Sequence, residues 1–141
     1  MRRHGHVVAA RIAAAILGSA AALAIAQTPA EAGRKDFLAK CATCHGKDGK
    51  GGGPYADQLK QGLPDLTTMA KRNGGTFPAK RTAESIEGAG KGHGPREMPV
   101  WGLDYTVEAA QVLPDMPVNQ AQFVRGRIAA LVAHLERIQV R

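Results

Sequence analysis

The sequence is poor in cysteine and in aromatic residues. It has two cysteines, one tryptophan, two tyrosines and three phenylalanines among 141 residues. So few aromatic side chains, without any dense run of basic residues, argue against a nucleic-acid-binding surface. Runs that alternate apolar and polar residues are also missing, which argues against a β-sheet. We therefore expect a small all-α protein whose own side chains fill only a thin core.

The N-terminal segment has the composition of a secretory signal peptide. Residues 1–11 are basic, and residues 12–26 form an uncharged, alanine-rich apolar run that closes on an Ala-x-Ala tripeptide, Ala-Ile-Ala. A charged start, a short apolar core and small residues at a cleavage point are typical of exported proteins. The alternative is a retained anchor, because the uncharged run from Ile12 to Ala30 is about as long as a bilayer requires. Only in that case would the chain be attached to a membrane.

The residues that follow indicate where this signal peptide is cut. TPAE at 28–31 has the pattern of an N-cap threonine, a first-turn proline and the glutamate of a capping box. A helix start has no use in a discarded peptide, so we expect cleavage after Ala26 and a single mature domain over residues 27–141. Cleavage after Ala32 is the alternative.

Part of the positive charge belongs to the signal peptide. Removing residues 1–26 takes away three arginines and no acidic residue, so the formal charge falls from +7 to +4. The remaining basic residues are interleaved with acidic ones. The mature chain is long enough for one domain and too short for two.

Glycine, proline and apolar spacing divide the mature chain into helices and loops. Before the first cysteine, Phe37 and Leu38 are expected to point inward from the first helix. The C-terminal helix shows the clearest apolar face, with spacings of four, three, four and three residues. That face consists of Val124, Ile128, Leu131, Leu135 and Ile138. The expected helices span residues 28–41, 65–72, 78–88 and the chain from Asn119 onward, with loops over 46–64 (holding a short helical piece near 55–61) and 88–102.

Both cysteines lie in the hexapeptide CATCHG at 41–46. Four interpretations compete: a disulfide, a redox dithiol, half of a zinc site, or covalently bound haem. A disulfide across two intervening residues would close a very small loop and would give His45 no role. A thioredoxin-type dithiol requires a parallel sheet that the sequence does not indicate. Zinc requires about four ligands, and beyond the motif the mature chain offers only His93 and His134, which are far apart.

Covalent haem attachment uses all three residues of the motif. On a helical turn, Cys41 and Cys44 lie on one face and can reach two vinyl groups on one porphyrin edge. His45 follows at once, so its imidazole can turn over the ring to the iron. Cys-x-x-Cys-His is the pattern of c-type haem attachment. Haem is also a large apolar group, which would complete the thin core.

Further motifs stand in a fixed order around CATCHG. Gly33, Phe37 and Cys41 are spaced by four residues, MPVWG follows at 98–102, and LVAHL stands at 131–135. This order resembles a class I c-type cytochrome over essentially the whole mature chain. The resemblance implies a cytochrome c fold of three to five helices around one covalent haem c, with the first and last helices crossing. It also implies maturation in a bacterial periplasm, and electron transfer rather than enzymatic turnover of a substrate.

The resemblance further implies the second ligand of the iron. In that family the methionine in the position of Met98 binds the iron opposite the histidine, here His45. The residues after it, here Pro99 and Trp101, shape the loop along the haem edge. Trp101 is expected to cover this edge and to donate its indole N–H to a propionate.

Other residues compete for the position of Met98. Met116 repeats the sequence Met-Pro-Val but lacks the Trp-Gly that follows. His93 lies between glycines and could also reach the iron. Met69 falls in an expected helix, so we assign it to packing.

Two positions match the family less closely. The proline whose carbonyl steadies the iron-bound histidine corresponds to Pro64 or Pro54, and the sequence LPDLT favours Pro64. The last helix carries His134 where the family usually has an aromatic residue. A contact of His134 with Phe37 across Gly33 would therefore be smaller and titratable.

Ligation by histidine and methionine predicts the function. Both axial positions would be filled, and the thioether would raise the reduction potential relative to two nitrogen ligands. The iron would then only exchange electrons with redox proteins, a donor and an acceptor, through a small transient interface. Lysines and arginines near the haem edge would steer acidic partners to it. The candidates are Lys47, Lys50, Lys91 and Arg96.

Two other functions are compatible with the motifs. If Met98 does not bind the iron, the protein would be a five-coordinate haem module that binds a small ligand. Alternatively, it would be a haem subunit held permanently by a dehydrogenase or an oxidase.

Overall fold

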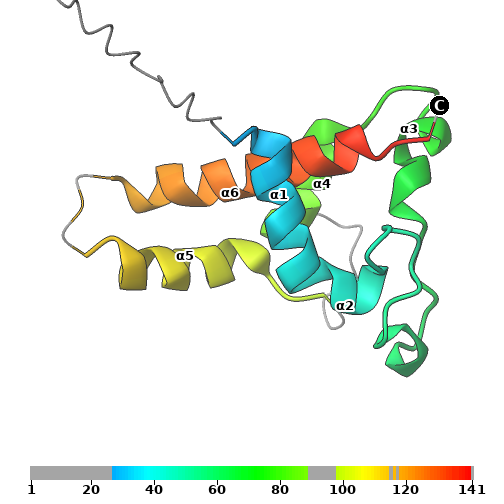
Figure 1. Cartoon of the computed structure of the whole chain (residues 1–141), viewed down its shortest axis with the longest axis horizontal. Coiled ribbons are helices and arrows are strands. Elements are labelled where there is room, and N and C mark those ends of the chain that lie inside the picture. The colour runs from blue at the N-terminus through cyan, green and yellow to red at the C-terminus, as the bar shows by residue number, and fades with distance from the viewer. Residues whose placement is uncertain (1–26, 89–97, 115, 117, 141) are drawn as a thin grey trace, which may run out of the picture.

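The computed structural model describes residues 27–88, 98–114, 116 and 118–140. Within these residues the chain forms helices and irregular connections and no strand, which confirms the expected all-α class. None of the described helices has the length and apolar character needed to cross a bilayer. The predicted signal peptide lies outside the described residues. The elements (Figure 1) are α1 (Pro29–Asp36), the π-helical turn η1 (Phe37–Cys41), α2 (Ala42–His45), the 3₁₀ turns η2 (Ala56–Gln58) and η3 (Leu66–Thr68), α3 (Met69–Arg72), α4 (Ala79–Glu87), α5 (Trp101–Val112) and α6 (Gln120–Arg137).

The elements α1, η1 and α2 follow one another without a break (Figure 1). The predicted capping box opens this segment. Thr28 Oγ1 accepts the N–H of Glu31 at 3.3 Å, and Glu31 Oε2 accepts the N–H of Thr28 at 2.9 Å. Phe37 points inward as expected and is 1% exposed, while Leu38 is half-buried. The first helix therefore begins where the sequence predicts and carries the chain into the cysteine motif.

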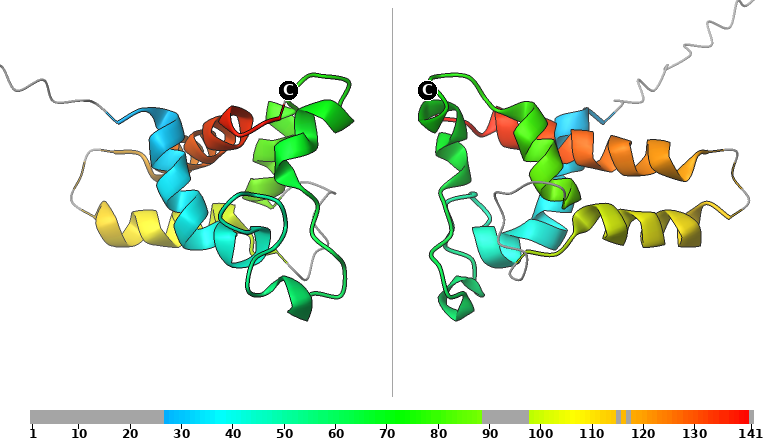
Figure 2. Two further views of the ribbon diagram at one scale, coloured as in Figure 1. Left: turned by 45° about the vertical axis from the view of Figure 1, so that its right-hand side comes forward. Right: turned by 180° about the vertical axis from the view of Figure 1, so that it is seen from behind.

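The expected crossing of the first and last helices is present, and it is centred on Gly33. A Cβ at this position would lie 1.8 Å from the carbonyl oxygen of Ala130 and 2.8 Å from the backbone nitrogen of Leu131. Only a residue without a side chain permits such an approach. In η1, directly after α1, Phe37 contacts His134, with ring centroids 5.2 Å apart at an interplanar angle of 53°. The predicted contact between these two rings is confirmed, and Figures 1 and 2 show α1 lying across α6.

The apolar face of α6 is buried as its spacing predicts. Asn119 caps the helix, and its Oδ1 accepts the N–H of Ala121 at 2.8 Å. Ile138 stands at the C-terminal cap and is half-buried. The fully buried positions of the face are Val124, Ile128, Leu131 and Leu135.

The short helices are also found in the segments that the positions of glycine and proline predict. The segment 65–72 forms η3 and α3, and Asp65 Oδ1 accepts the N–H of Thr67 at 2.8 Å to start the first turn. The segment 78–88 contains α4, which ends at Gly88 with φ at 99°. The predicted helical piece near 55–61 is η2.

Helix α5 is not predicted by the sequence analysis. It begins at Trp101, inside the stretch 88–102 whose glycines and prolines indicate an irregular loop. Its outward-facing Leu103 and Val107 are 64% and 51% exposed. Apolar residues therefore occur on both sides of α5, and this blurs the amphipathic pattern by which such a helix is detected. The buried positions are Gly102, Tyr105 and Ala109.

A polar cluster attaches α5 to α1 and α6. Arg127 Nη2 donates to Asp36 Oδ1 at 2.7 Å, and its Nε lies 2.7 Å from Asp36 Oδ2. The buried hydroxyl of Tyr105 donates to Asp36 Oδ2 at 3.2 Å. Burial, together with the charge of Asp36, raises the pKa of Tyr105, so this hydroxyl stays protonated. Lys40 Nζ lies 2.6 Å from Asp104 Oδ2 and adds a second link from the first helical segment to α5.

The end of α4 touches the start of α5. A Cβ on Gly88 would lie 2.5 Å from Val100 Cγ1, and a Cβ on Gly102 would lie 2.7 Å from the carbonyl oxygen of Glu87. The chain therefore enters α5 beside the point where it leaves α4. Met98, two residues before Val100, is held close to this junction.

Candidate functional site

A cavity of about 310 Å³ lies among α2, α3, α4 and α6. Its volume is at the lower end of the range of about 300–1,000 Å³ that is typical of small-molecule sites. The walls are mostly apolar and continue into the buried core of the domain. The apolar lining residues include Phe37, Pro64, Leu66, Ile86, Leu131 and Leu135.

The CATCHG motif forms one wall of this cavity. Cys41 ends the turn η1, and α2 then carries Cys44 and His45. Cys41 and His45 line the cavity, His45 being only 6% exposed. Cys44 is half-buried on the same turn of helix. The helical spacing therefore brings the two thiols and the imidazole together, as the sequence predicts.

The loop that follows His45 folds back and fixes the motif (Figure 2). Three of its backbone N–H groups donate to the carbonyls that the end of α2 would otherwise leave without partners. A Cβ on Gly53 would lie 2.4 Å from the carbonyl oxygen of Thr43, so this return requires glycine. The bonds run from Gly51 to His45 (2.8 Å), from Gly53 to Cys44 (3.1 Å) and from Tyr55 to Thr43 (3.0 Å).

The surroundings of Cys41 disfavour a thiolate. Burial raises the pKa of the Cys41 thiol to about 12, and the charge of Asp36 adds to the effect. The thiolate is the form of cysteine that binds metals and attacks disulfides, so redox and metal chemistry are disfavoured at this position. A thioether carries no charge and suits the same apolar position.

Comparison with known proteins identifies the family of most of the chain. The model of the family described as Cytochrome c matches residues 30–136. The chain belongs to the cytochrome c family. Its cofactor is therefore haem c, bound covalently by Cys41 and Cys44, and haem-based electron transfer is the chemistry that the family implies. No curated protein and no solved structure matches the chain significantly.

The cavity fits the haem of a cytochrome c. Cys41 can form an uncharged thioether, His45 offers an imidazole to the iron, and the apolar walls match the porphyrin. Phe37 is one of the few large aromatic side chains in the chain, and it forms part of the wall. The cavity adjoins the hydrophobic core, which agrees with the expectation that the cofactor completes it.

Several predicted haem-contacting residues meet at this cavity. Met98 and Pro64 line it together with His45. Met69, which the sequence analysis assigns to packing, lines it as well and also packs against the core. Pro54 lies instead beside a separate surface depression formed by the loop after the motif.

Other candidates are placed elsewhere. Within the described residues, the lining of the cavity does not include Trp101. That residue is half-buried against the core, and Lys40 Nζ lies 5.4 Å from its ring centroid. Met116 is 55% exposed in the connection between α5 and α6, which lies away from α2 in Figure 1. His93 lies outside the described residues.

The structure adds four polar lining residues that the sequence analysis does not name. Helical spacing could have found part of this set, because Thr82 lies four residues before the buried Ile86. No sequence signal distinguishes the arginines of the set from ordinary surface arginines. The four residues are Arg72, Arg81, Thr82 and Ser85.

Proposed function

We propose that this cytochrome c is a class I electron carrier of the bacterial periplasm, with His45 and Met98 as the axial ligands of its haem iron. The observation that supports this proposal most strongly is that His45, Met98 and Cys41 line the same cavity. The haem supplies an iron that gains and loses one electron. The protein supplies the two axial ligands, the apolar walls and the surface on which partners dock.

Met98 is favoured over Met69 by the way each side chain is used. Among the described residues, Met69 packs against the hydrophobic core, whereas Met98 is not one of the residues packed against it. Met69 also belongs to the short helix α3, whereas Met98 belongs to no helix and precedes α5. The thioether of Met98 is therefore the one that is available to bind the iron. Its ligation would raise the reduction potential relative to two nitrogen ligands.

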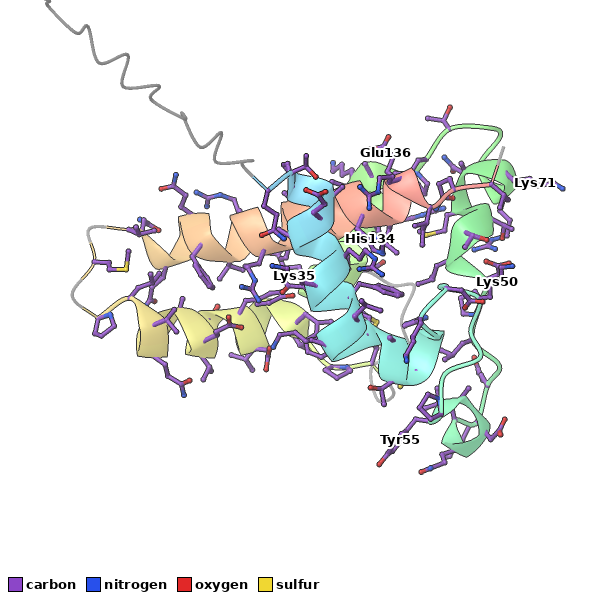
Figure 3. All side chains as sticks on the ribbon, in the orientation of Figure 1. Lys35, Lys50, Tyr55, Lys71, His134 and Glu136 are labelled. Atoms are coloured by element: carbon purple, nitrogen blue, oxygen red, sulfur yellow. The ribbon has the colours of Figure 1, made fainter. Side chains whose placement is uncertain are left out.

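Filled axial positions exclude substrate and dioxygen from the iron. The remaining function is electron exchange with a donor and an acceptor protein through a small transient interface. Lys47 and Lys50 are exposed on the loop that follows His45, and Figure 3 shows Lys50 on the side of that loop. They support steering of acidic partners to the haem. Lys91 and Arg96, the other two cations proposed for this role, lie outside the described residues.

The proposed compartment rests on the N-terminal sequence. Residues 1–26 have the composition of a signal peptide, and the capped start of α1 at Thr28 favours cleavage after Ala26. Mass spectrometry of the protein from a periplasmic extract tests this directly. A mature N-terminus at Gln27 is expected, whereas retention of residues 1–26 in a membrane fraction would contradict it.

Optical spectroscopy of the purified holoprotein tests the ligand set. The oxidised protein should show the weak near-infrared band of sulfur ligation, and the reduced protein should not bind carbon monoxide. Absence of that band together with rapid carbon monoxide binding would identify a five-coordinate haem module instead. Copurification with a dehydrogenase or oxidase in fixed stoichiometry would identify a permanent subunit.

A further inference from the structure

Two arginines line the haem cavity, and the functions described above do not use them. Arg72 ends α3 and Arg81 lies in the first turn of α4. The described lining residues include no aspartate and no glutamate. Two guanidinium groups are therefore placed at the margin of a mostly apolar space without a carboxylate in the described wall.

Neither arginine has a carboxylate partner among the described residues. Lys40, Arg127 and Lys80 each form an ion pair with a carboxylate. Within the described residues, no ion pair joins Arg72 or Arg81 to a carboxylate. Both are exposed, so water can solvate their charge. Their position at the mouth of the cavity nevertheless suits an anionic group that projects from a ligand inside it.

Arg72 is also held in position. Its Nη1 donates to the carbonyl oxygen of Asp65 at 2.8 Å and to the hydroxyl of Thr68. These bonds occupy Nη1 and fix the orientation of the other guanidinium nitrogens. A guanidinium fixed in this way can bind a carboxylate with little further loss of side-chain entropy.

We propose that Arg72 and Arg81 bind the two propionate carboxylates of the haem, one arginine to each. In haem the propionates project from the part of the ring remote from the vinyl groups. With the vinyl groups attached at the motif, the propionates would therefore point away from α2. In Figures 1 and 2, α3 and α4 lie above α2, beside the C-terminal half of α6. Arg72 and Arg81 line the cavity and would therefore take the role of donor to a propionate that the sequence suggested for Trp101.

The proposal rests on haem in this cavity and not on the identity of the second axial ligand. It is tested by carbon-13 NMR of holoprotein whose haem is labelled at the propionate carboxyls, titrated from low to neutral pH. A cation close to a carboxylate lowers its pKa by roughly 1–3 units. In the wild-type protein both propionates should therefore titrate well below the value of about 4.3 that is ordinary for such a side chain.

Single substitutions then show which arginine binds which propionate. Arg72→Gln and Arg81→Gln should each raise the pKa of one propionate by roughly 1 unit or more and leave the other unchanged. Arg72→Lys and Arg81→Lys keep the charge and should restore most of the low pKa. The matched controls are Lys71→Gln and Lys80→Gln, which remove a charge from the adjacent residue. Lys71 points outward from α3 (Figure 3), and the side chain of Lys80 is 92% exposed.

The propionate titrations can contradict the proposal in two ways. Ordinary pKa values for both propionates in the wild-type protein would overturn the proposal, even if no arginine variant folds. Equal titrations in the arginine and the lysine variants would also overturn it. A protein without sulfur ligation of the iron would contradict the proposed function but would leave the propionate titration, and this inference, unaffected.

Discussion

Gly33 of α1 faces the carbonyl oxygen of Ala130 in α6 so closely that a Cβ would lie 1.8 Å from that oxygen. Because the neighbouring atoms belong to backbone, they cannot rotate away. Gly33→Ala should therefore force the two helices apart and destabilise the holoprotein by roughly 1–3 kcal/mol. Urea-induced unfolding followed by circular dichroism measures this change.

Gly126 in α6 provides the matched control for that substitution. A Cβ at Gly126 would meet nothing within 4 Å. Gly126→Ala should therefore stabilise the helix by about 0.5–1 kcal/mol, as alanine does in a helix interior. If the two substitutions have the same effect, the crossing of α1 and α6 is not at Gly33.

His134 should make stability depend on pH. It is 5% exposed, and its Nδ1 has no hydrogen-bond partner within the described residues. Burial lowers the pKa of His134, and the charges of Arg137 and Arg34 lower it further. The unfolded state, with a histidine pKa of about 6.5, then binds more protons than the folded state. Stability should be greatest above pH 6.5 and should decrease as the pH falls through the lower pKa of the folded protein.

His134→Phe isolates this contribution, because phenylalanine keeps the contact with Phe37 and does not titrate. The free energy of unfolding, measured in urea between pH 5 and pH 8, should decrease less on acidification in the variant than in the wild type. All other groups are common to both proteins, so their contributions cancel in the comparison. Identical pH profiles would show that His134 does not titrate in this range.

The ion pair between Asp36 and Arg127 should be important for stability. Its carboxylate side chain is 13% exposed, so loss of the guanidinium would leave a nearly buried charge with the Tyr105 hydroxyl as its partner. Arg127→Met should destabilise the protein by about 1.5–3 kcal/mol, measured by urea unfolding. Lys80→Met breaks an exposed pair on α4 and should change stability by less than about 0.5 kcal/mol. Similar losses in the two variants would contradict the role of the cluster.

Replacement of Met98 tests the proposed iron ligand. Met98→Ala should remove the near-infrared sulfur band, lower the reduction potential and allow the reduced iron to bind carbon monoxide. Met69→Ala, from the same cavity, should lower stability but keep the band. Met116→Ala, from the exposed connection, should change neither. If Met69→Ala loses the band and Met98→Ala keeps it, Met69 is the ligand.

The site was predictable where the chemistry is local in sequence. Cys41, Cys44 and His45 lie on one helical turn, so their spacing alone brings them together. The capping box at Thr28 and the apolar face of α6 were predictable for the same reason. Each depends on residues within one or a few turns.

The rest depends on how distant segments pack. Met69 and Met116 are both methionines in short segments, and only the packed structure places one at the cavity and the other in an exposed connection. Helix α5 was missed because its apolar residues occur on more than one face. Its placement depends on contacts that Tyr105 and Arg127 make with Asp36. Tyr105 is 69 residues from Asp36 in the sequence, and Arg127 is 91 residues from it.

The contact between Gly88 and Val100 makes the position of Met98 independent of the number of residues between Gly88 and Met98. The intervening residues connect two points that already touch, so the packing of α4 on α5 does not depend on how many there are. Doubling the length of such a loop costs only about 0.6 kcal/mol in closure entropy. Met98 stays beside the junction whatever that length is. Substitutions or insertions between Gly88 and Met98 should therefore leave the position of the methionine unchanged.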